Sequence, residues 1–284
     1  GFLAVCTTDF VQGSLMLVGI LVVPIIAYNM LDGDMITALS ANGISDTDGY
    51  LSMFLNNGAA YSPKEILSQL AWGLGYCGMP HILVRFMAVK NEKELKKSSV
   101  IAIIWVAISL IFACVIGIVG RAYIVPVLEN SATETVFVEM IKKVFSVDLT
   151  LPFIGGIFLC GILAAIMSTA DSQLLVCASS VSKDIYKNIL KPDAPDDKVL
   201  KISRITVLVI AVLAFIIAWN PDSSIMGLVS DAWAGLGSAF GPLVVCSLFW
   251  KRTNLPGAVA GILSGGIFVI ISDYIPLAGG QTPY

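Results

Sequence analysis

The stretch ILSQLAWGLGYCGMPHILVRFMAV, residues Ile66–Val89, is long and apolar enough to cross a membrane, yet it carries residues that interrupt helices. Gly73, Gly75, Gly78 and Pro80 fall within eight residues. Interior glycine weakens a helix by about 1 kcal/mol and interior proline by about 3 kcal/mol. We therefore expect an unwound or kinked segment at membrane depth. Such backbone is tolerated only where it lines a cavity or is packed within protein.

The composition of the whole chain is typical of an all-α, polytopic membrane protein. Apolar residues (AVILMFWYC) make up 57% of the 284 residues, charged residues 13%, and the mean hydropathy is +0.87. Soluble proteins carry about 25% charged residues, so this chain has too few charges to cover a water-facing surface. One His and six scattered Cys argue against a zinc site. Lys and Arg form no basic patch, so nucleic acid is not expected as a partner. No hydrolase, zincin or P-loop motif indicates an enzyme, and no cofactor is expected.

Seven segments match the roughly 20 apolar residues that a membrane span requires. Alternating crossings place the connections 90–99, 182–204 and 251–254 on the same side as residue 1. All but four of the 17 lysines and arginines lie on that side, which the positive-inside rule makes cytoplasmic. The expected spans are Phe10–Leu31, Ile66–Val89, Val100–Val119, Leu151–Val181, Ile202–Trp219, Ile225–Trp250 and Gly257–Ile275.

Two long connections, 32–63 and 122–150, are expected on the extracytoplasmic side, and 182–204 forms a cytoplasmic loop. The first is rich in Gly, Ser, Asn and Asp, with a short helix expected at Tyr50–Leu55. The second has apolar residues at helical spacing over Val136–Phe145. Such a helix either lies on the membrane or caps an outer vestibule, and simple surface packing is the more common role. We treat residues 1–284 as a single transmembrane domain.

Three residues of the interrupted span are candidates for binding a small zwitterion. Trp72, Tyr76 and Pro80 are spaced at i, i+4 and i+8, so they share one face if the helix is roughly continuous. Two aromatic rings near free backbone groups suit a small molecule carrying both charges. The alternative is a proline kink used only for packing, since Gly and Pro are frequent in membrane helices. His81 is interpreted as a hydrogen-bonded structural residue, and Arg85 as reaching the cytoplasmic interface.

The span Leu151–Val181 is too long for a perpendicular crossing and concentrates oxygen-bearing side chains. Its 31 residues extend about 46 Å, so it must tilt or leave the bilayer. Ser168, Thr169, Asp171, Ser172 and Gln173 crowd six positions, and such oxygens are the hard ligands that a small cation requires. The alternative for the hydroxyls is back-bonding to a carbonyl one turn earlier. A charge at membrane depth costs at least about 2.5 kcal/mol, so Asp171 suggests an ion path.

The last two spans carry glycines that favour close helix packing. In Ile225–Trp250, Asp231 lies among several glycines and Pro242, so we expect a break or a close helix contact. The final span has a double GxxxG pattern, a packing stripe to which we assign no chemistry: Gly257, Gly261 and Gly265.

Four stretches resemble the solute:sodium symporter family, and two of them resemble its proline-transporting branch. LAWGLGYCGMPHILVRFMA (70–88) and GLVSDAWAGLGSAFGPLV (227–244) are similar to that branch. ILAAIMSTADSQLLVCASSVSKDIY (162–186) matches the family more widely, and TTDFVQGSLM (7–16) also matches. The resemblance implies a LeuT-type fold of two inverted five-helix repeats. It also implies a chain that is part of a longer protein, without the first four helices and the C-terminal end.

The resemblance also implies specific roles. Ala165 would offer its backbone carbonyl, and Ser168 and Thr169 their hydroxyls, to a coupling sodium ion. Trp72 and Tyr76 would pack on a pyrrolidine ring, with Pro80 on the same substrate side. Asp171, Ser172 and Gln173 are additional candidates for a polar ion path.

The resulting expectation is sodium-coupled uptake of L-proline across a bacterial inner membrane by alternating access. Met79 departs from the Gln expected in the proline branch, which leaves a symporter for another small solute, such as pantothenate or another amino acid, as an alternative. A transporter-like solute sensor is a second alternative, and proton coupling through Asp171 or His81 a third. The neutral oxygen ligands favour sodium.

Overall fold

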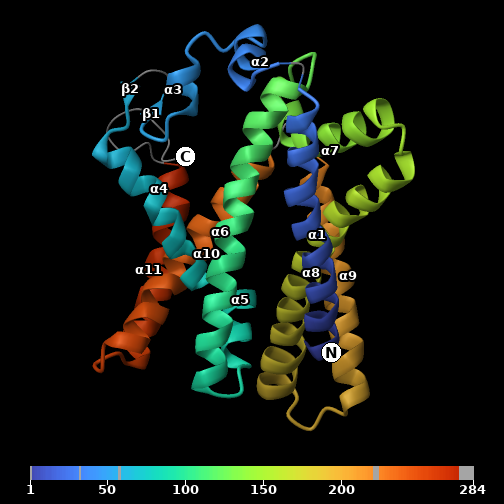
Figure 1. The fold of residues 1–284 in the computed structure, drawn as a ribbon. Coiled ribbons are helices and arrows are strands. Elements are labelled where there is room, and N and C mark those ends of the chain that lie inside the picture. Colours follow the sequence, from blue (N-terminus) through green and yellow to red (C-terminus); the bar gives the residue numbers. More distant parts are fainter. Residues whose placement is uncertain (1, 32, 57–58, 220–223, 275–284) are drawn as a thin grey trace. The chain divides into compact units, whose positions relative to one another are not determined.

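The computed structural model describes residues 2–31, 33–56, 59–219 and 224–274 (Figure 1). Apart from the connecting segments and one short antiparallel pair of strands that aligns Leu55 with Ala60, these residues are helical. In chain order the elements are α1 (Phe2–Asn29), α2 (Met35–Ala41), α3 (Thr47–Leu51), β1 (Leu55–Asn56), β2 (Ala59–Ala60), α4 (Pro63–Gly75), the 3₁₀ turn η1 (Tyr76–Gly78), α5 (Pro80–Met87), α6 (Glu92–Tyr123), the 3₁₀ segment η2 (Asn130–Thr135), α7 (Val136–Ile141), the π-helical η3 (Lys142–Asp148), α8 (Pro152–Ser179), the π-helical η4 (Ser180–Leu190), α9 (Asp196–Ala218), α10 (Ile225–Phe249) and α11 (Leu255–Tyr274).

Six continuous helices in the described ranges are long and apolar enough to cross a membrane: α1, α6, α8 with η4, α9, α10 and α11. They correspond to six of the seven expected spans, so the all-α, polytopic architecture is confirmed. The seventh, Ile66–Val89, is divided into α4, η1 and α5, as its glycines and proline predict. Helix α8 continues into η4 for 39 residues in all, longer than the sequence pattern suggested. The expected end of the last span, Ile275, lies outside the described residues.

Contacts within the chain form two compact units. Unit 1 comprises residues 1–60 and 92–214, and Unit 2 comprises residues 61–91 and 215–284. Unit 1 therefore holds α1, α6 and α8, whereas Unit 2 holds the interrupted helix with α10 and α11.

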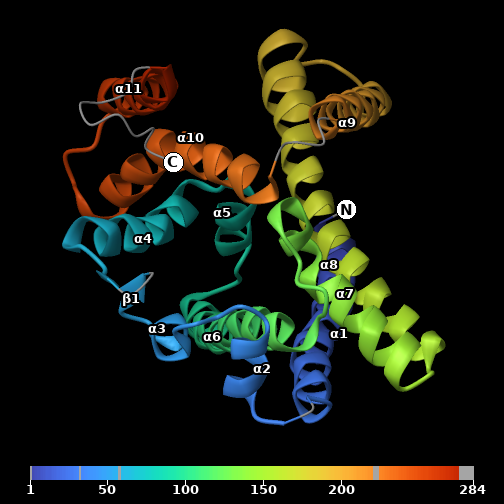
Figure 2. The same cartoon turned by 90° about the horizontal axis from the view of Figure 1, so that it is seen from above.

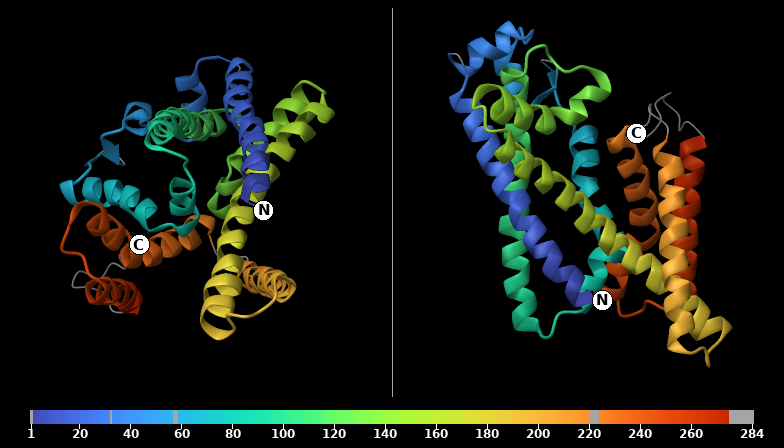
Figure 3. Two further views of the ribbon diagram at one scale, coloured as in Figure 1. Left: turned by 90° about the horizontal axis from the view of Figure 1, so that it is seen from below. Right: turned by 90° about the vertical axis from the view of Figure 1, so that its right-hand side faces the viewer.

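The core of Unit 1 lies where α7 and η3 pack across the ends of α1 and α6. Helix α1 packs along both α8 and α6, and the oblique course of α8 past α1 is visible in Figure 3. Apolar side chains from four elements fill this region. They are Val23, Ala27, Ile116, Val119, Tyr123, Met140, Ile141, Val144 and Phe145.

The amphipathic segment expected over Val136–Phe145 is a packed part of this core. Met140, Ile141 and Val144 have no exposed surface. On the opposite face, Lys142 and Glu139 form an ion pair of 2.7 Å and remain accessible. The structure supports the packing role, because the apolar face is turned inward against the helices of Unit 1.

The connection 32–63 folds differently from the expectation. The predicted helix at Tyr50–Leu55 is wrong: α3 spans Thr47–Leu51, and Leu55 lies in β1. The Asp46 carboxylate accepts a hydrogen bond from the Gly49 N–H at 2.9 Å, a side-chain cap that starts the helix earlier. Within this connection, residues 32 and 57–58 lie outside the described part of the chain.

Asn42 ties this connection to the end of α6. Its side-chain amide donates to the carbonyl oxygens of Arg121 (3.0 Å) and Ala122 (2.9 Å). In return, Arg121 Nη2 donates to the carbonyl oxygen of Asn42 at 2.9 Å. These bonds satisfy carbonyls that the helix end leaves without partners.

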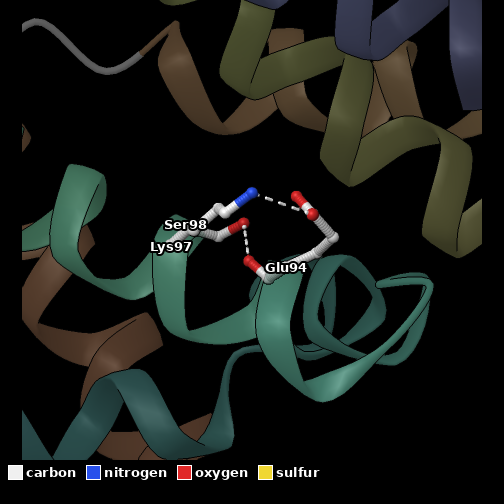
Figure 4. Close-up of polar contacts among 3 residues, drawn as sticks. All are labelled: Glu94, Lys97 and Ser98. Carbon is white, nitrogen blue, oxygen red and sulfur yellow. Dashed lines mark hydrogen bonds and ion pairs between the residues drawn. The ribbon is translucent and has the colours of Figure 1, made fainter.

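In Unit 1, the start of α1, the start of α6 and the η4–α9 connection lie at one end (Figure 1). Most lysines of this unit belong to these segments, so its positive charge is concentrated at one end. The first turns of α6 show how they are arranged (Figure 4): Lys97 pairs with Glu94 at 3.2 Å, and the Ser98 hydroxyl donates to the Glu94 carbonyl oxygen at 2.8 Å. Both charged side chains are exposed, so the pair contributes little stability.

Unit 2 is organised around α10, which packs against α4, η1 and α11 (Figure 2). Glycines bring the backbones into direct contact. A Cβ placed on Gly78 would lie 2.4 Å from the Leu236 carbonyl oxygen, and one on Gly237 would lie 2.9 Å from Gly75 Cα. We call this the glycine contact (Gly75, Gly78 and Gly237). It confirms the close packing that the glycines of α10 predict, and α10 itself is continuous through Pro242.

Candidate functional site

Helix α4 has a well-defined start just before the expected span. The Ser62 hydroxyl accepts from the Glu65 N–H at 3.3 Å, and the Glu65 carboxylate accepts from the Ser62 N–H at 2.7 Å. This reciprocal capping box, with Pro63 in the first turn, fixes where the helix begins. Hydrogen bonds from the side chain and then the backbone of Ser62 hold the pKa of Glu65 below its usual range.

The same helix ends after only 13 residues, because the local sequence cannot continue it. Tyr76–Gly78 form a single 3₁₀ turn, and Met79 is extended, with φ −82° and ψ 110°. Pro80 then opens α5: it has no N–H to lose, and its fixed φ suits a first helical position. It also biases the preceding residue toward extended backbone, as seen at Met79. The break therefore leaves backbone groups outside the regular helical bonding pattern.

Three aromatic rings from α4, η1 and α10 meet beside the break. Trp72 and Trp233 are stacked, with ring centroids 6.4 Å apart and planes 17° from parallel. Tyr76 meets Trp233 edge to face, at 5.3 Å and 84°. We call Trp72, Tyr76 and Trp233 the aromatic trio. Such pairs prefer these geometries and contribute about 0.5–1.5 kcal/mol beyond the area they bury.

A groove of ≈ 940 Å³ runs between α4 and α10, with Trp72 and Trp233 in its wall. Apolar and small side chains dominate it, with hydroxyl and amide groups from Ser68, Gln69 and Ser230. None of its described lining residues is charged. A volume of this order accommodates a small organic molecule.

The three predicted substrate residues are only partly brought together. Trp72 lines the groove, and Tyr76 contacts the Trp233 ring that lines it. Pro80 lies beyond the break as the first residue of α5 and does not line the groove. Trp72, Tyr76 and Pro80 were expected to share one face only if the helix were continuous. Because the helix is interrupted at η1, that condition is not met.

In Unit 1, the three predicted sodium ligands lie on one turn of α8. The Ser168 hydroxyl donates to the Ala165 carbonyl oxygen at 3.1 Å, and the Thr169 hydroxyl donates to the same oxygen at 3.4 Å. We call these three oxygens the oxygen cluster. These bonds are the back-bonding that was given above as the alternative to a sodium site. They also bring three hard oxygen atoms together at one point of the helix.

The polar residues that follow divide into a buried one and two exposed ones. Ser172 is 6% exposed, and its hydroxyl lies 3.0 Å from the Ser168 carbonyl oxygen and 3.3 Å from Asp9 Oδ2 of α1. Asp171 and Gln173 are exposed on the neighbouring faces of the helix. The carboxylate in contact with Ser172 is thus that of Asp9, from another helix, whereas Asp171 is exposed.

Two residues with a place in these arrangements were missed from sequence. Trp233 lies in the stretch 227–244, which was noted for its glycines. The available signal was the large ring beside these small residues, because glycines let a neighbouring helix come close enough to contact the ring. Asp9 lies in the apolar helix α1, where a charge is costly and indicates function, yet only Asp171 was interpreted in this way from sequence. Across the described ranges, no group of His, Cys, Asp and Glu is arranged to hold a metal ion.

Comparison with known proteins gives one family. The sequence profile of the sodium:solute symporter family matches residues 1–265. The osmoregulated proline transporter OpuE of Bacillus subtilis is 43% identical over 271 residues, which are 95% of this chain and 53% of that protein.

Two staphylococcal proteins show a similar relation. Sodium/proline symporter 2 of Staphylococcus saprophyticus is 41% identical over 278 residues, 95% of this chain and 52% of that protein. The sodium/proline symporter of Staphylococcus aureus is 41% identical over 275 residues, again 95% and 52%. The chain thus spans about half the length of the curated relatives it matches.

Proposed function

Because this chain belongs to the sodium:solute symporter family, we propose that it contributes to sodium-coupled uptake of L-proline. The relatives that are named for proline are 41–43% identical over 95% of the chain. The structural observation that carries the proposal is the groove beside the helix break, with its aromatic wall and uncharged lining. In this proposal the protein carries out no covalent chemistry and uses no cofactor, and sodium and L-proline are its transported partners.

The groove suits proline in shape and polarity. The rings of Trp72 and Trp233 line the groove, and Tyr76 packs edge to face on Trp233. These rings offer an aromatic surface on which the saturated pyrrolidine ring of proline packs well. Backbone groups freed at the break supply dipoles for the ammonium and carboxylate, since interrupted membrane helices bind charged ends in this way. Pro80 acts by holding the break open rather than by touching the substrate.

Sodium would bind at the oxygen cluster of α8. Hydroxyl and carbonyl oxygens of Ser168, Thr169 and Ala165 are hard ligands suited to a small cation. The hydroxyls would turn from the Ala165 carbonyl toward the ion, and further ligands would complete its shell. The Asp9 carboxylate, near the cluster through Ser172, would favour a cation there. Asp171, Ser172 and Gln173 would provide a polar route to it.

Transport would follow alternating access. Sodium binding at α8 would stabilise the conformation that accepts proline, and the inward sodium gradient would drive uptake. We further propose that both units belong to one transmembrane transporter domain in the bacterial plasma membrane. The residue 1 end would be cytoplasmic, because the positive charge is concentrated there.

Uptake of radiolabelled L-proline tests this function directly. The protein is expressed from its complete reading frame and reconstituted in vesicles, with an imposed sodium gradient, a potassium gradient or a proton gradient. We expect uptake only with sodium, and competition by unlabelled proline. Uptake driven by protons would refute the coupling ion, competition by pantothenate but not proline would refute the substrate, and proline binding without uptake would favour a sensor.

A further inference from the structure

The indole of Trp233 has a polar group that the packing of Unit 2 does not use. Its Nε1 is buried, and no acceptor for it is present among the described residues. The indole N–H is a donor only, so a buried one without an acceptor is unfavourable. Phe or Leu at this position would fill the space between the helices without burying an N–H group. The N–H therefore calls for an explanation beyond the stacking with Trp72.

The position of this donor coincides with the helix break. A Cβ placed on Gly75, the last residue of α4, would lie 2.6 Å from Trp233 Cδ1 and 3.5 Å from Nε1. The polar edge of the indole is thus turned toward bare backbone at the point where α4 ends. Gly75 gives this edge its room, since any side chain there would displace it.

The groove beside it has a matching deficiency. Its described lining contains no Lys, Arg or His, so a carboxylate brought into this site depends on neutral donors, among them the hydroxyl and amide groups of Ser68, Gln69 and Ser230. Hydrogen bonds from neutral donors to an ionised acceptor are stronger than those between neutral groups. The indole N–H of Trp233 is a side-chain donor next to the backbone groups of the break.

We propose that Trp233 is a specificity-determining residue that donates its indole N–H to the carboxylate of the transported amino acid. This inference rests on the proposed function and extends it by one substrate-binding residue. In the conformation described here, Trp233 is packed against Gly75 and Trp72, with the N–H covered. Entry of the substrate carboxylate at the break would supply the missing acceptor, so the aromatic trio would open for substrates that carry this group.

The first test compares substrates that differ in the carboxylate. In the reconstituted protein, Trp233→Phe keeps an aromatic ring and removes the donor. We expect the KM for L-proline to rise about 10- to 100-fold, the range for a hydrogen bond to a charged group. Inhibition by L-prolinamide and by pyrrolidine, which lack the carboxylate, should change less than about twofold by the same reasoning. Trp219→Phe, which alters a ring packed on Phe215 in α9, should leave all three unchanged.

A second pair of variants displaces the indole without changing it. Gly75→Ala introduces a Cβ against the indole edge, whereas Gly73→Ala adds one where nothing lies within 4 Å. We expect Gly75→Ala to lower the preference for L-proline over L-prolinamide and Gly73→Ala to preserve it. The amount of protein eluting as a single species in detergent shows whether each variant is folded.

The outcomes separate the two proposals. If the wild-type protein shows no sodium-driven proline uptake, the proposed function fails and this inference falls with it. If wild-type uptake is normal and Trp233→Phe retains both KM and selectivity, only the inference is overturned. Equal losses for proline and pyrrolidine would also overturn it, because they would assign Trp233 to the ring and not to the carboxylate.

Discussion

Adding one methyl group at Gly78 should destabilise Unit 2, because it would force α10 away from the helix break. A Cβ at Gly78 would lie 2.4 Å from the Leu236 carbonyl oxygen and 2.8 Å from Gly237 Cα. Ordinary contacts begin at 3.4 Å, so the two backbones must separate by about 1 Å. Both neighbours are backbone atoms of a helix, which cannot rotate aside as a side chain would. Gly78 has no positive φ, so the whole effect is steric.

Such overpacking costs about 1–3 kcal/mol in well-packed interiors. In proteins of 150–250 residues, 1 kcal/mol shifts Tm by about 2–4 °C, so we expect Gly78→Ala to lower Tm by several degrees. The assay is thermal unfolding of the detergent-solubilised protein, followed by tryptophan fluorescence. Gly73→Ala is the matched control, since a Cβ there meets nothing within 4 Å. Alanine is the better helix former, so the control should be at least as stable as wild type.

Equal melting temperatures for Gly78→Ala and Gly73→Ala would refute this reasoning. That result would mean that the backbones of η1 and α10 are not in contact in the folded protein. The glycine contact would then lose its role in shaping the groove. A lower Tm for Gly78→Ala together with a normal Tm for Gly73→Ala is the outcome that supports it.

Three further predictions concern other parts of the chain. Ser168→Ala should raise the sodium concentration for half-maximal uptake by about tenfold, because one lost ligand is worth about 1.4 kcal/mol. Thr206→Ala removes a similar back-bonded hydroxyl in α9 and should leave that concentration unchanged. Equal effects of the two substitutions would contradict the assignment of Ser168 to the sodium site. Met140→Ala should destabilise the protein by about 2–5 kcal/mol, because that side chain is fully buried; a change in Tm within error would show that α7 is not part of the core. Because hydrogen bonds from Ser62 lower the pKa of Glu65, the capping box is intact above that pKa and is lost as the pH falls through it. The protection factors of amides in the first turn of α4, corrected for the intrinsic exchange rate at each pH, should therefore fall in acid, whereas Ser62→Ala should show low protection already at neutral pH. Equal protection of the two proteins at neutral pH would argue against the box.

Local sequence signals predicted the interrupted helix well, because glycine and proline act on the backbone of their own segment. The position of the break at Tyr76–Met79 follows from Gly75, Gly78 and Pro80 alone. The same kind of signal was overlooked at Asp46, whose side chain caps α3 and moves that helix ahead of the expected Tyr50–Leu55.

The contacts between distant segments could not be predicted in this way. Nothing in the periodicity near Trp72 indicates that Trp233 stacks on it, since the two lie in separate helices that meet only through tertiary packing. Asp9 and Ser172 pose the same problem in Unit 1. The sequence pattern identified Ser168 and Thr169 as neighbours, because they share one turn of one helix, but it could not show that Asp9 of α1 contacts Ser172.

The length of the helix formed by α8 and η4 has a mechanical consequence. Leu190 lies 22 residues beyond Ser168, roughly 30 Å along the axis. A tilt of about 10° centred on the oxygen cluster would therefore swing the far end of this lever by about 5 Å. Residues 191–195 join that end directly to the start of α9, so the displacement would also move α9; the exposed pair of Lys187 with Asp196 at 2.6 Å adds little to this link. If sodium binding at the proposed site produces such a tilt, the movement would be large enough to follow with a pair of spin labels.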